Sequence, residues 1–110
     1  MAYLIEKTPK EIKNLINDPN SEPIILDVRE KWEYDICHIK NSLNIPMGQL
    51  VDRMSEFDKY DLYVIVCHHG IRSRMIGKYL SNIGFTNIVN LTNGIDGWAD
   101  EIDNTMEKYV

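Results

Sequence analysis

The chain has 110 residues, of which 44% are hydrophobic and 26% charged, and this composition fits one globular domain over residues 1–110. Its formal net charge of −5 argues against nucleic acid or an anionic membrane as a partner. No apolar run is long enough to span a membrane, and the first residues lack the basic-then-apolar pattern of a signal peptide. We therefore expect the two cysteines to be free thiols in a reducing cytoplasm.

Short apolar segments alternate with amphipathic ones along the chain, which predicts an α/β fold. Strands are expected at residues 3–5, 24–27, 43–45, 62–66 and 88–91. Helices are expected after the capping box of Thr8 and Glu11, at 31–36, around 50–57, at 75–83 before Gly84, and at 95–102. This order predicts a mostly parallel five-stranded sheet with helices on both faces.

The most informative segment is Cys67-His68-His69-Gly70-Ile71-Arg72-Ser73, between a predicted buried strand and a predicted helix. Backbone N–H groups and the positive end of a helix dipole favour an anion at such a turn. They would stabilise a thiolate, which is the nucleophilic form of cysteine. Asp27 and Arg29 follow another predicted strand, and the carboxyl ends of parallel strands share one edge of the sheet. We therefore expect these residues near Cys67.

Three ordered segments resemble the signatures of the rhodanese (sulfurtransferase) homology domain over nearly the whole chain. They are Ile25-Leu26-Asp27-Val28-Arg29-Glu30 with Trp32-Glu33-Tyr34 and residues 38–46, then Cys67-x-x-Gly70-x-Arg72-Ser73, then Leu91-Thr92-Asn93-Gly94-Ile95-Asp96-Gly97-Trp98. Cys37 and Asn93 stand where that family usually has glycine. Asn tolerates a left-handed backbone, so Asn93 is expected to keep its turn.

The resemblance implies a rhodanese-like fold and a persulfide mechanism with no cofactor and no metal. Cys67 would attack the outer sulfur of thiosulfate or a persulfide, and a thiol or cyanide acceptor would then remove that sulfur. The implied substrate-binding residues are those that follow Cys67 in the loop, with Asp27 and Arg29 as supporting residues: His68, His69, Gly70, Ile71, Arg72 and Ser73.

Loop length bears on the reaction class. Related folds that act as phosphatases or arsenate reductases resemble Cys-x5-Arg, because a tetrahedral oxyanion needs a wider loop. Here the spacing from Cys67 to Arg72 is Cys-x4-Arg, which favours a sulfur atom as the bound group. The sequence therefore favours a sulfurtransferase over a phosphatase.

Several alternatives stay open at this point. Some family members are non-catalytic interaction modules, and others pass sulfur to an acceptor protein. The three histidines lie in the segments Cys37-His38 and Cys67-His68-His69, but this spacing does not match structural zinc sites. Cys37 could form a disulfide with Cys67 if the two thiols lie within bonding distance. Because histidine is largely neutral at pH 7, His68 and His69 predict a preference for persulfides over anionic thiosulfate.

Overall fold

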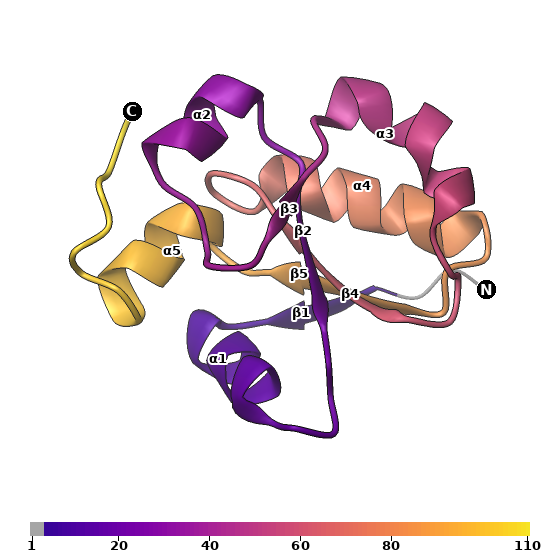
Figure 1. Ribbon diagram of the computed structural model, residues 1–110, viewed down its shortest axis with the longest axis horizontal. Coiled ribbons are helices and arrows are strands. Elements are labelled where there is room, and N and C mark those ends of the chain that lie inside the picture. Colours follow the sequence, from indigo (N-terminus) through magenta and orange to yellow (C-terminus); the bar gives the residue numbers. More distant parts are fainter. Residues whose placement is uncertain (1–3) are drawn as a thin grey trace.

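The structure is a computed structural model, described over residues 4–110 (Figure 1). Its centre is a five-stranded sheet with the strand order β1-β5-β4-β2-β3, and each neighbouring pair of strands is parallel. The strands are β1 (Ile5–Lys7), β2 (Ile24–Asp27), β3 (Leu43–Asn44), β4 (Leu62–Val66) and β5 (Asn87–Leu91). The predicted parallel sheet of five strands is confirmed.

The helices are α1 (Pro9–Asn17), α2 (Lys31–Ile36), α3 (Met47–Arg53), the 3-10 helix η1 (Met54–Glu56), α4 (Ile71–Asn82) and α5 (Gly94–Glu101). The predicted capping box begins α1: the Glu11 N–H donates to Thr8 Oγ1, and the Thr8 N–H donates to the Glu11 carboxylate. Gly84 has a φ of 104° and ends α4 as predicted. Within residues 4–110, no helix combines the length and the apolar character that crossing a membrane requires.

Helices cover both faces of the sheet, as the alternation of strand and helix predicts (Figure 1). In β4, Tyr63 and Ile65 pack toward α3 and α4, whereas Val64 and Val66 pack toward α1 and α5. This two-residue period is that of a strand buried on both sides. Cys67 continues the pattern one residue past β4, so its side chain lies on the α4 face of the sheet.

Some boundaries differ from those expected. β1 begins at Ile5, while Tyr3 of the predicted strand 3–5 lies outside the described residues. In place of one helix around 50–57, the chain forms α3 up to Arg53 and then the short η1, which ends at Glu56. α4 begins at Ile71, four residues before the expected start. Its first turn is part of the cysteine loop and shows no apolar stripe, so periodicity could not detect it.

The C-terminal segment, residues 102–110, runs from α5 back toward α2 (Figure 1). Met106 and Tyr109 pack against the core on the α5 face, together with Ile36 of α2 and Ile102. The segment therefore closes the carboxyl edge of the sheet beside the cysteine loop.

Candidate active site

Cys67 accepts hydrogen bonds from the loop that follows it. The N–H groups of Gly70 and Ser73 donate to Cys67 Sγ at 3.1 and 3.3 Å, and the Ser73 hydroxyl lies 3.3 Å from Sγ. Cys67 is 1% exposed and Ser73 is fully buried, so these contacts are shielded from water. Two N–H donors at the start of α4 point at the sulfur atom, an arrangement that can stabilise a negative charge placed there. The predicted arrangement of main-chain donors thus involves Gly70 and Ser73.

The first turn of α5 binds the outer side of the same loop. The N–H of Ile95 donates to the Cys67 carbonyl at 2.8 Å, and the N–H of Asp96 donates to the His68 carbonyl at 3.1 Å. Gly94 is in direct contact: a Cβ there would lie 2.4 Å from the Cys67 carbonyl oxygen and 2.6 Å from that of His68. Because α5 binds these carbonyls, the opposite side of the loop can direct N–H groups to Sγ.

Gly70 has the backbone conformation that this loop requires. Its φ is 94°, and an added Cβ would lie 3.1 Å from the Asn93 nitrogen and 3.3 Å from the Leu91 carbonyl oxygen. Its own carbonyl accepts a hydrogen bond from the buried amide of Asn90 at 3.1 Å. Asn93 has a φ of 65°, so it adopts the left-handed turn that was predicted.

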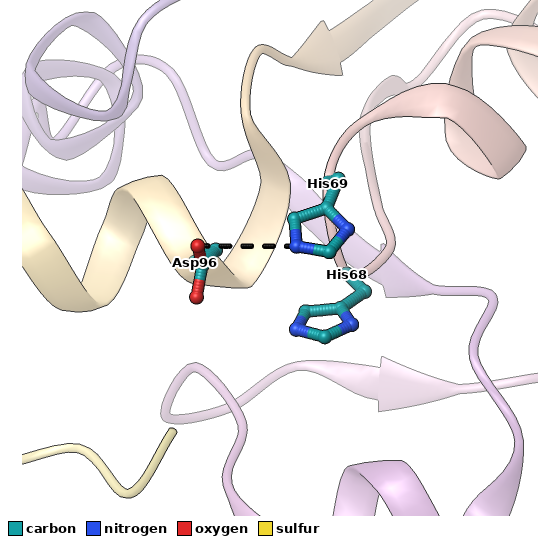
Figure 2. A group of neighbouring side chains, drawn as sticks. All are labelled: His68, His69 and Asp96. Atoms are coloured by element: carbon teal, nitrogen blue, oxygen red, sulfur yellow. Dashed lines mark ion pairs between the residues drawn. The ribbon is translucent and has the colours of Figure 1, made fainter. Parts of the chain in front are cut away.

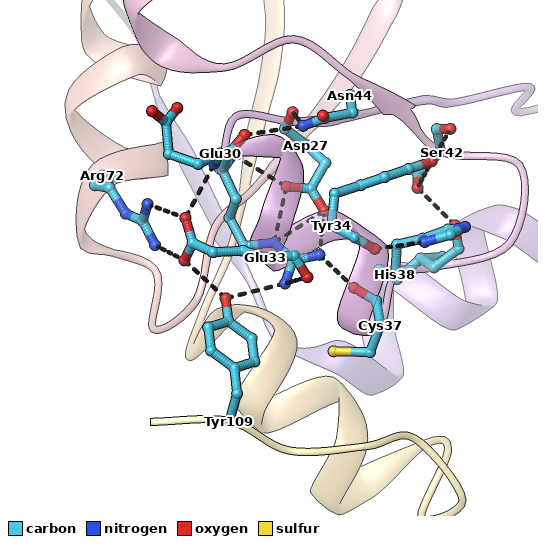
Figure 3. Close-up of polar contacts among 12 residues, drawn as sticks. Asp27, Glu30, Glu33, Tyr34, Cys37, His38, Ser42, Asn44, Arg72 and Tyr109 are labelled. Carbon is cyan, nitrogen blue, oxygen red and sulfur yellow. Dashed lines mark hydrogen bonds and ion pairs between the residues drawn. The ribbon is translucent and has the colours of Figure 1, made fainter.

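Arg72 forms a bidentate ion pair with Glu33 of α2 (Figure 3). Its two terminal nitrogens lie 2.8 and 2.7 Å from the two Glu33 carboxylate oxygens. These bonds from Arg72, aided by hydrogen bonds from Glu30 and Tyr109, lower the pKa of Glu33 to about 2 despite burial. The bonds to Glu33 raise the pKa of Arg72 in turn. The guanidinium charge is therefore neutralised within the protein.

Asp27 and Arg29 form a fully buried ion pair, with Arg29 Nη2 2.8 Å from an Asp27 carboxylate oxygen. Arg29 Nε and Nη2 donate to the Asp27 carboxylate, and Arg29 also donates to the Glu33 and Cys37 carbonyls at 3.3 and 2.7 Å. Within residues 4–110, neither side chain forms a hydrogen bond with Cys67 Sγ. Arg29 links the end of β2 to the first turn of α2 and to Cys37 at the C-terminal end of that helix.

Tyr109 belongs to the site although no sequence motif includes it. Its hydroxyl donates to Glu33 at 2.8 Å and accepts from Arg29 at 3.0 Å (Figure 3). Its ring stacks on that of His68, with centroids 4.0 Å apart, and meets Trp32 edge-on. Burial raises the pKa of Tyr109 to about 12, so the hydroxyl keeps its proton.

His68 and His69 stack on each other beside Asp96 (Figure 2). His68 is 8% exposed, and burial lowers its pKa below the ordinary value, which keeps the ring neutral at pH 7. His69 is exposed, and its Nε2 lies 3.9 Å from an Asp96 carboxylate oxygen. Ile71, the first residue of α4, also exposes its side chain.

His68, His69 and Asp96 each offer an atom that could ligate a metal ion, and these atoms lie within 4.8 Å of one another. The arrangement does not suit a metal ion, because imidazole ligates in the plane of its ring and the two rings are stacked 3.9 Å apart. Lys108 also lies 3.6 Å from Asp96 and supplies it with a cation. His68, His69 and Asp96 therefore act as a polar rim of the loop.

Cys37 lies on the other face of the sheet. It is buried in the cluster that contains Val66 and Trp98, whereas Cys67 belongs to the cluster beneath α4. Both cysteines are free. The φ of Cys37 is −162°, an extended conformation open to any residue, so its replacement of the family's glycine causes no backbone strain.

Comparison with known proteins agrees with this architecture. The sequence pattern of the family described as "Rhodanese-like domain" matches residues 8–101. A rhodanese-like domain protein from Staphylococcus aureus has 34% identity and a TM-score of 0.79, covering 96% of this chain and 99% of its own. A rhodanese-related protein from Thermoplasma volcanium has 31% identity and a TM-score of 0.80, covering 89% and 93%.

Curated relatives are longer. The "Adenylyltransferase and sulfurtransferase uba4" of Ogataea parapolymorpha is 35% identical over 89 residues, which are 79% of this chain and 23% of that protein. YrkF of Bacillus subtilis is 35% identical over 79 residues, which are 72% of this chain and 43% of YrkF. The chain thus spans less than half of either relative. The fold, the cysteine loop and the match over residues 8–101 together show that this chain belongs to the rhodanese-like domain family.

Proposed function

We propose that this protein is a sulfurtransferase in which Cys67 carries the transferred sulfur as a persulfide. The observation that supports the proposal most is the set of groups around Cys67 Sγ: the N–H groups of Gly70 and Ser73 donate to it, and the Ser73 hydroxyl lies in contact and can donate to a thiolate. They favour the thiolate before transfer, and fixed donors of this kind also stabilise a persulfide anion without reorganising. Family membership and a relative named as a sulfurtransferase support the same chemistry.

The reaction has two displacements. The Cys67 thiolate attacks the outer sulfur of the donor, the new Sγ–S bond forms, and the donor's S–S bond breaks. Its electron pair leaves with sulfite when thiosulfate is the donor, or with a thiolate when a persulfide is the donor. A cyanide or thiolate acceptor then attacks the outer sulfur and restores the Cys67 thiolate, which predicts ping-pong kinetics.

Two geometric features disfavour the competing functions. The Arg72 guanidinium is paired with the Glu33 carboxylate through both terminal nitrogens, which neutralises the positive charge that would attract a phosphoryl dianion. The donors at Sγ would have no use in a purely structural interaction module. Cys67 is also only 1% exposed, so its sulfur is accessible only to the terminal atom of a small donor. The outer sulfur of thiosulfate or of a persulfide is such an atom.

Intact-mass analysis after incubation with thiosulfate or glutathione persulfide tests the proposal. We expect wild-type protein to gain one sulfur atom that cyanide removes, and Cys67→Ser to gain none. Cys37→Ser is the matched control, because Cys37 lies on the other face of the sheet, and it should behave as wild type. Equal sulfur gain in wild type and Cys67→Ser would show that the persulfide assignment is wrong.

The charge around the loop bears on the donor. His68 is held neutral by burial, His69 lies beside Asp96, and Arg72 is paired with Glu33. The rim thus offers little unpaired positive charge to the thiosulfate dianion. We propose that persulfides are the better donors, measured as a higher kcat/KM for glutathione persulfide than for thiosulfate. A strong preference for thiosulfate would contradict this assignment.

We also propose that the acceptor can be a thiol on a partner protein, and that the protein works in the reducing cytoplasm, where a free thiol persists. Exposed apolar side chains near the start of α2 and on the first turns of α4 support a protein acceptor: Trp32, Ile71 and Met75. Transfer of labelled sulfur from Cys67 to an acceptor protein, compared with transfer to free glutathione, measures which acceptor is preferred.

A further inference from the structure

The C-terminal segment contributes to the candidate site although the family pattern ends at residue 101. Tyr109 lies eight residues beyond that limit, and its hydroxyl bridges Arg29 and Glu33. Its ring stacks on His68, the residue that follows the nucleophile. The Tyr109 side chain thus contacts both His68 of the cysteine loop and Glu33, the ion-pair partner of Arg72 in α4.

We infer that Tyr109 is a positioning residue for sulfur transfer, acting through Glu33 and Arg72 on the loop that binds Cys67 Sγ. The inference rests on the proposed function and assigns a role to a segment outside the family pattern. Tyr109 itself need not touch the donor or the acceptor.

The hydroxyl completes the hydrogen bonding of a buried carboxylate. Glu33 is 4% exposed and accepts from both terminal nitrogens of Arg72, from the Glu30 N–H and from the Tyr109 hydroxyl. One Glu33 oxygen is shared by Arg72 and Tyr109, so loss of the hydroxyl leaves that oxygen with Arg72 alone. A carboxylate that keeps three of its four hydrogen bonds is held less firmly, and Arg72 would move with it.

A displacement of Arg72 would alter the contacts of Cys67 Sγ because of where Arg72 lies in the chain. It lies in the first turn of α4, directly before Ser73, whose N–H and hydroxyl contact Cys67 Sγ. A small displacement of this turn lengthens contacts that are already 3.3 Å. Rates of group transfer are sensitive to such displacements.

The test compares Tyr109→Phe, which retains the stacked ring and removes the hydroxyl, with Tyr60→Phe, a control at an exposed tyrosine. The measurement is the single-turnover rate of Cys67 persulfide formation at increasing glutathione persulfide. We expect Tyr109→Phe to lower the rate at saturating donor by about threefold to tenfold, with the half-saturating concentration unchanged. Tyr60→Phe should match wild type. A Tyr109→Phe rate equal to that of Tyr60→Phe overturns the inference.

A double-mutant cycle with Arg72→Lys separates positioning from general destabilisation. Lysine cannot form the two parallel bonds to Glu33, so the path through Arg72 is already weakened. If Tyr109 acts through that path, Tyr109→Phe should reduce the rate less in the Arg72→Lys background than in wild type. Fully additive losses would show that Tyr109 acts by another route and overturn the inference.

A spectroscopic readout covers the case in which Arg72→Lys does not fold. In reduced protein, Tyr109→Phe should shift the Ser73 amide proton resonance, whereas Tyr60→Phe should leave it in place. An unchanged Ser73 resonance would overturn the inference. Failure of wild type to form any persulfide would instead contradict the proposed function, so the two failures are distinguishable.

Discussion

At the scale of single residues, the candidate chemistry depends on what surrounds one sulfur atom. Within residues 4–110, the hydrogen-bond partners of Cys67 Sγ are the N–H groups of Gly70 and Ser73 and the Ser73 hydroxyl, and none is a cationic side chain. The charge of Arg72, the residue before Ser73, is paired with the Glu33 carboxylate. An anion on this sulfur would be stabilised by the N–H dipoles that contact it and by the charges of Arg72 and Arg74, both of which interact with Cys67.

Replacing Ser73 with alanine removes the hydroxyl and keeps the N–H that donates to Sγ. We expect persulfide formation to slow by about tenfold, because one of three fixed donors to a developing anion is lost. Ser55→Ala, at an exposed serine, is the control. Single-turnover rates measure the difference, and a Ser73→Ala rate equal to that of the control would show that the hydroxyl plays no part.

The lowered pKa of Glu33 predicts that the free energy of unfolding falls in acid. Its pKa is lowered from 4.5 to about 2, chiefly by Arg72, so its contribution is complete above pH 4.5 and is lost as pH falls toward 2. The shift corresponds to at most about 3 kcal/mol of unfolding free energy. Chemical denaturation at several pH values should show a smaller acid loss for Glu33→Gln than for wild type. Parallel losses in the two proteins would contradict the assigned role of the ion pair.

Sequence patterns predict a residue of the site well when its partners are near in the chain. The loop from Cys67 to Ser73 forms its own contacts, so strand, turn and helix signals could indicate its geometry, although its catalytic role stays a prediction. Tyr109 and Asn90 lie far from the loop in sequence, so only the folded chain brings them to the site. Glu33 lies in a segment that the family resemblance covers, but its pairing with Arg72 required the structure.

At the scale of elements, α5 determines the shape of the cysteine loop. Its first N–H groups bind the carbonyls of Cys67 and His68, and Gly94 allows the helix to approach them closely. The alternation of segments predicted each helix and strand, yet it placed the start of α4 four residues late. The first turn of that helix serves the sulfur site instead of the core, so no apolar stripe marks it.

Gly94→Ala should disrupt this contact. The new Cβ would meet two backbone oxygens at 2.4 and 2.6 Å, and φ at this position is 57°. We expect a loss of at least about 2 kcal/mol in unfolding free energy and slower persulfide formation. Gly48→Ala is the matched control within a helix, because nothing lies within 4 Å of its Cβ. Equal stability of the two variants by chemical denaturation would refute the close approach.

At the scale of the whole molecule, the sheet separates the two thiols. Cys67 belongs to the core beneath α4, whereas Cys37 packs with α5 on the opposite face. Spacing along the chain could not reveal this separation, because it depends on which way each side chain points. The C-terminal segment returns to α2 and joins the second core, which brings Tyr109 to the site.

Mild peroxide should therefore not produce a disulfide between Cys37 and Cys67 in the folded protein, because each thiol is buried on its own side of the sheet. Intact-mass analysis and peptide mapping should find no cross-link between the two cysteines in wild type. Detection of that cross-link under native conditions would contradict the arrangement of the two cores.

The most direct measurement of the central claim follows a heavy sulfur isotope through Cys67. Protein loaded with a labelled outer sulfur and freed of donor is mixed with unlabelled donor and a thiol acceptor. We predict that the label leaves Cys67 in one exponential phase at least as fast as steady-state turnover and is recovered quantitatively in the acceptor persulfide. Label that stays on Cys67 while turnover continues would show that the persulfide is not an intermediate.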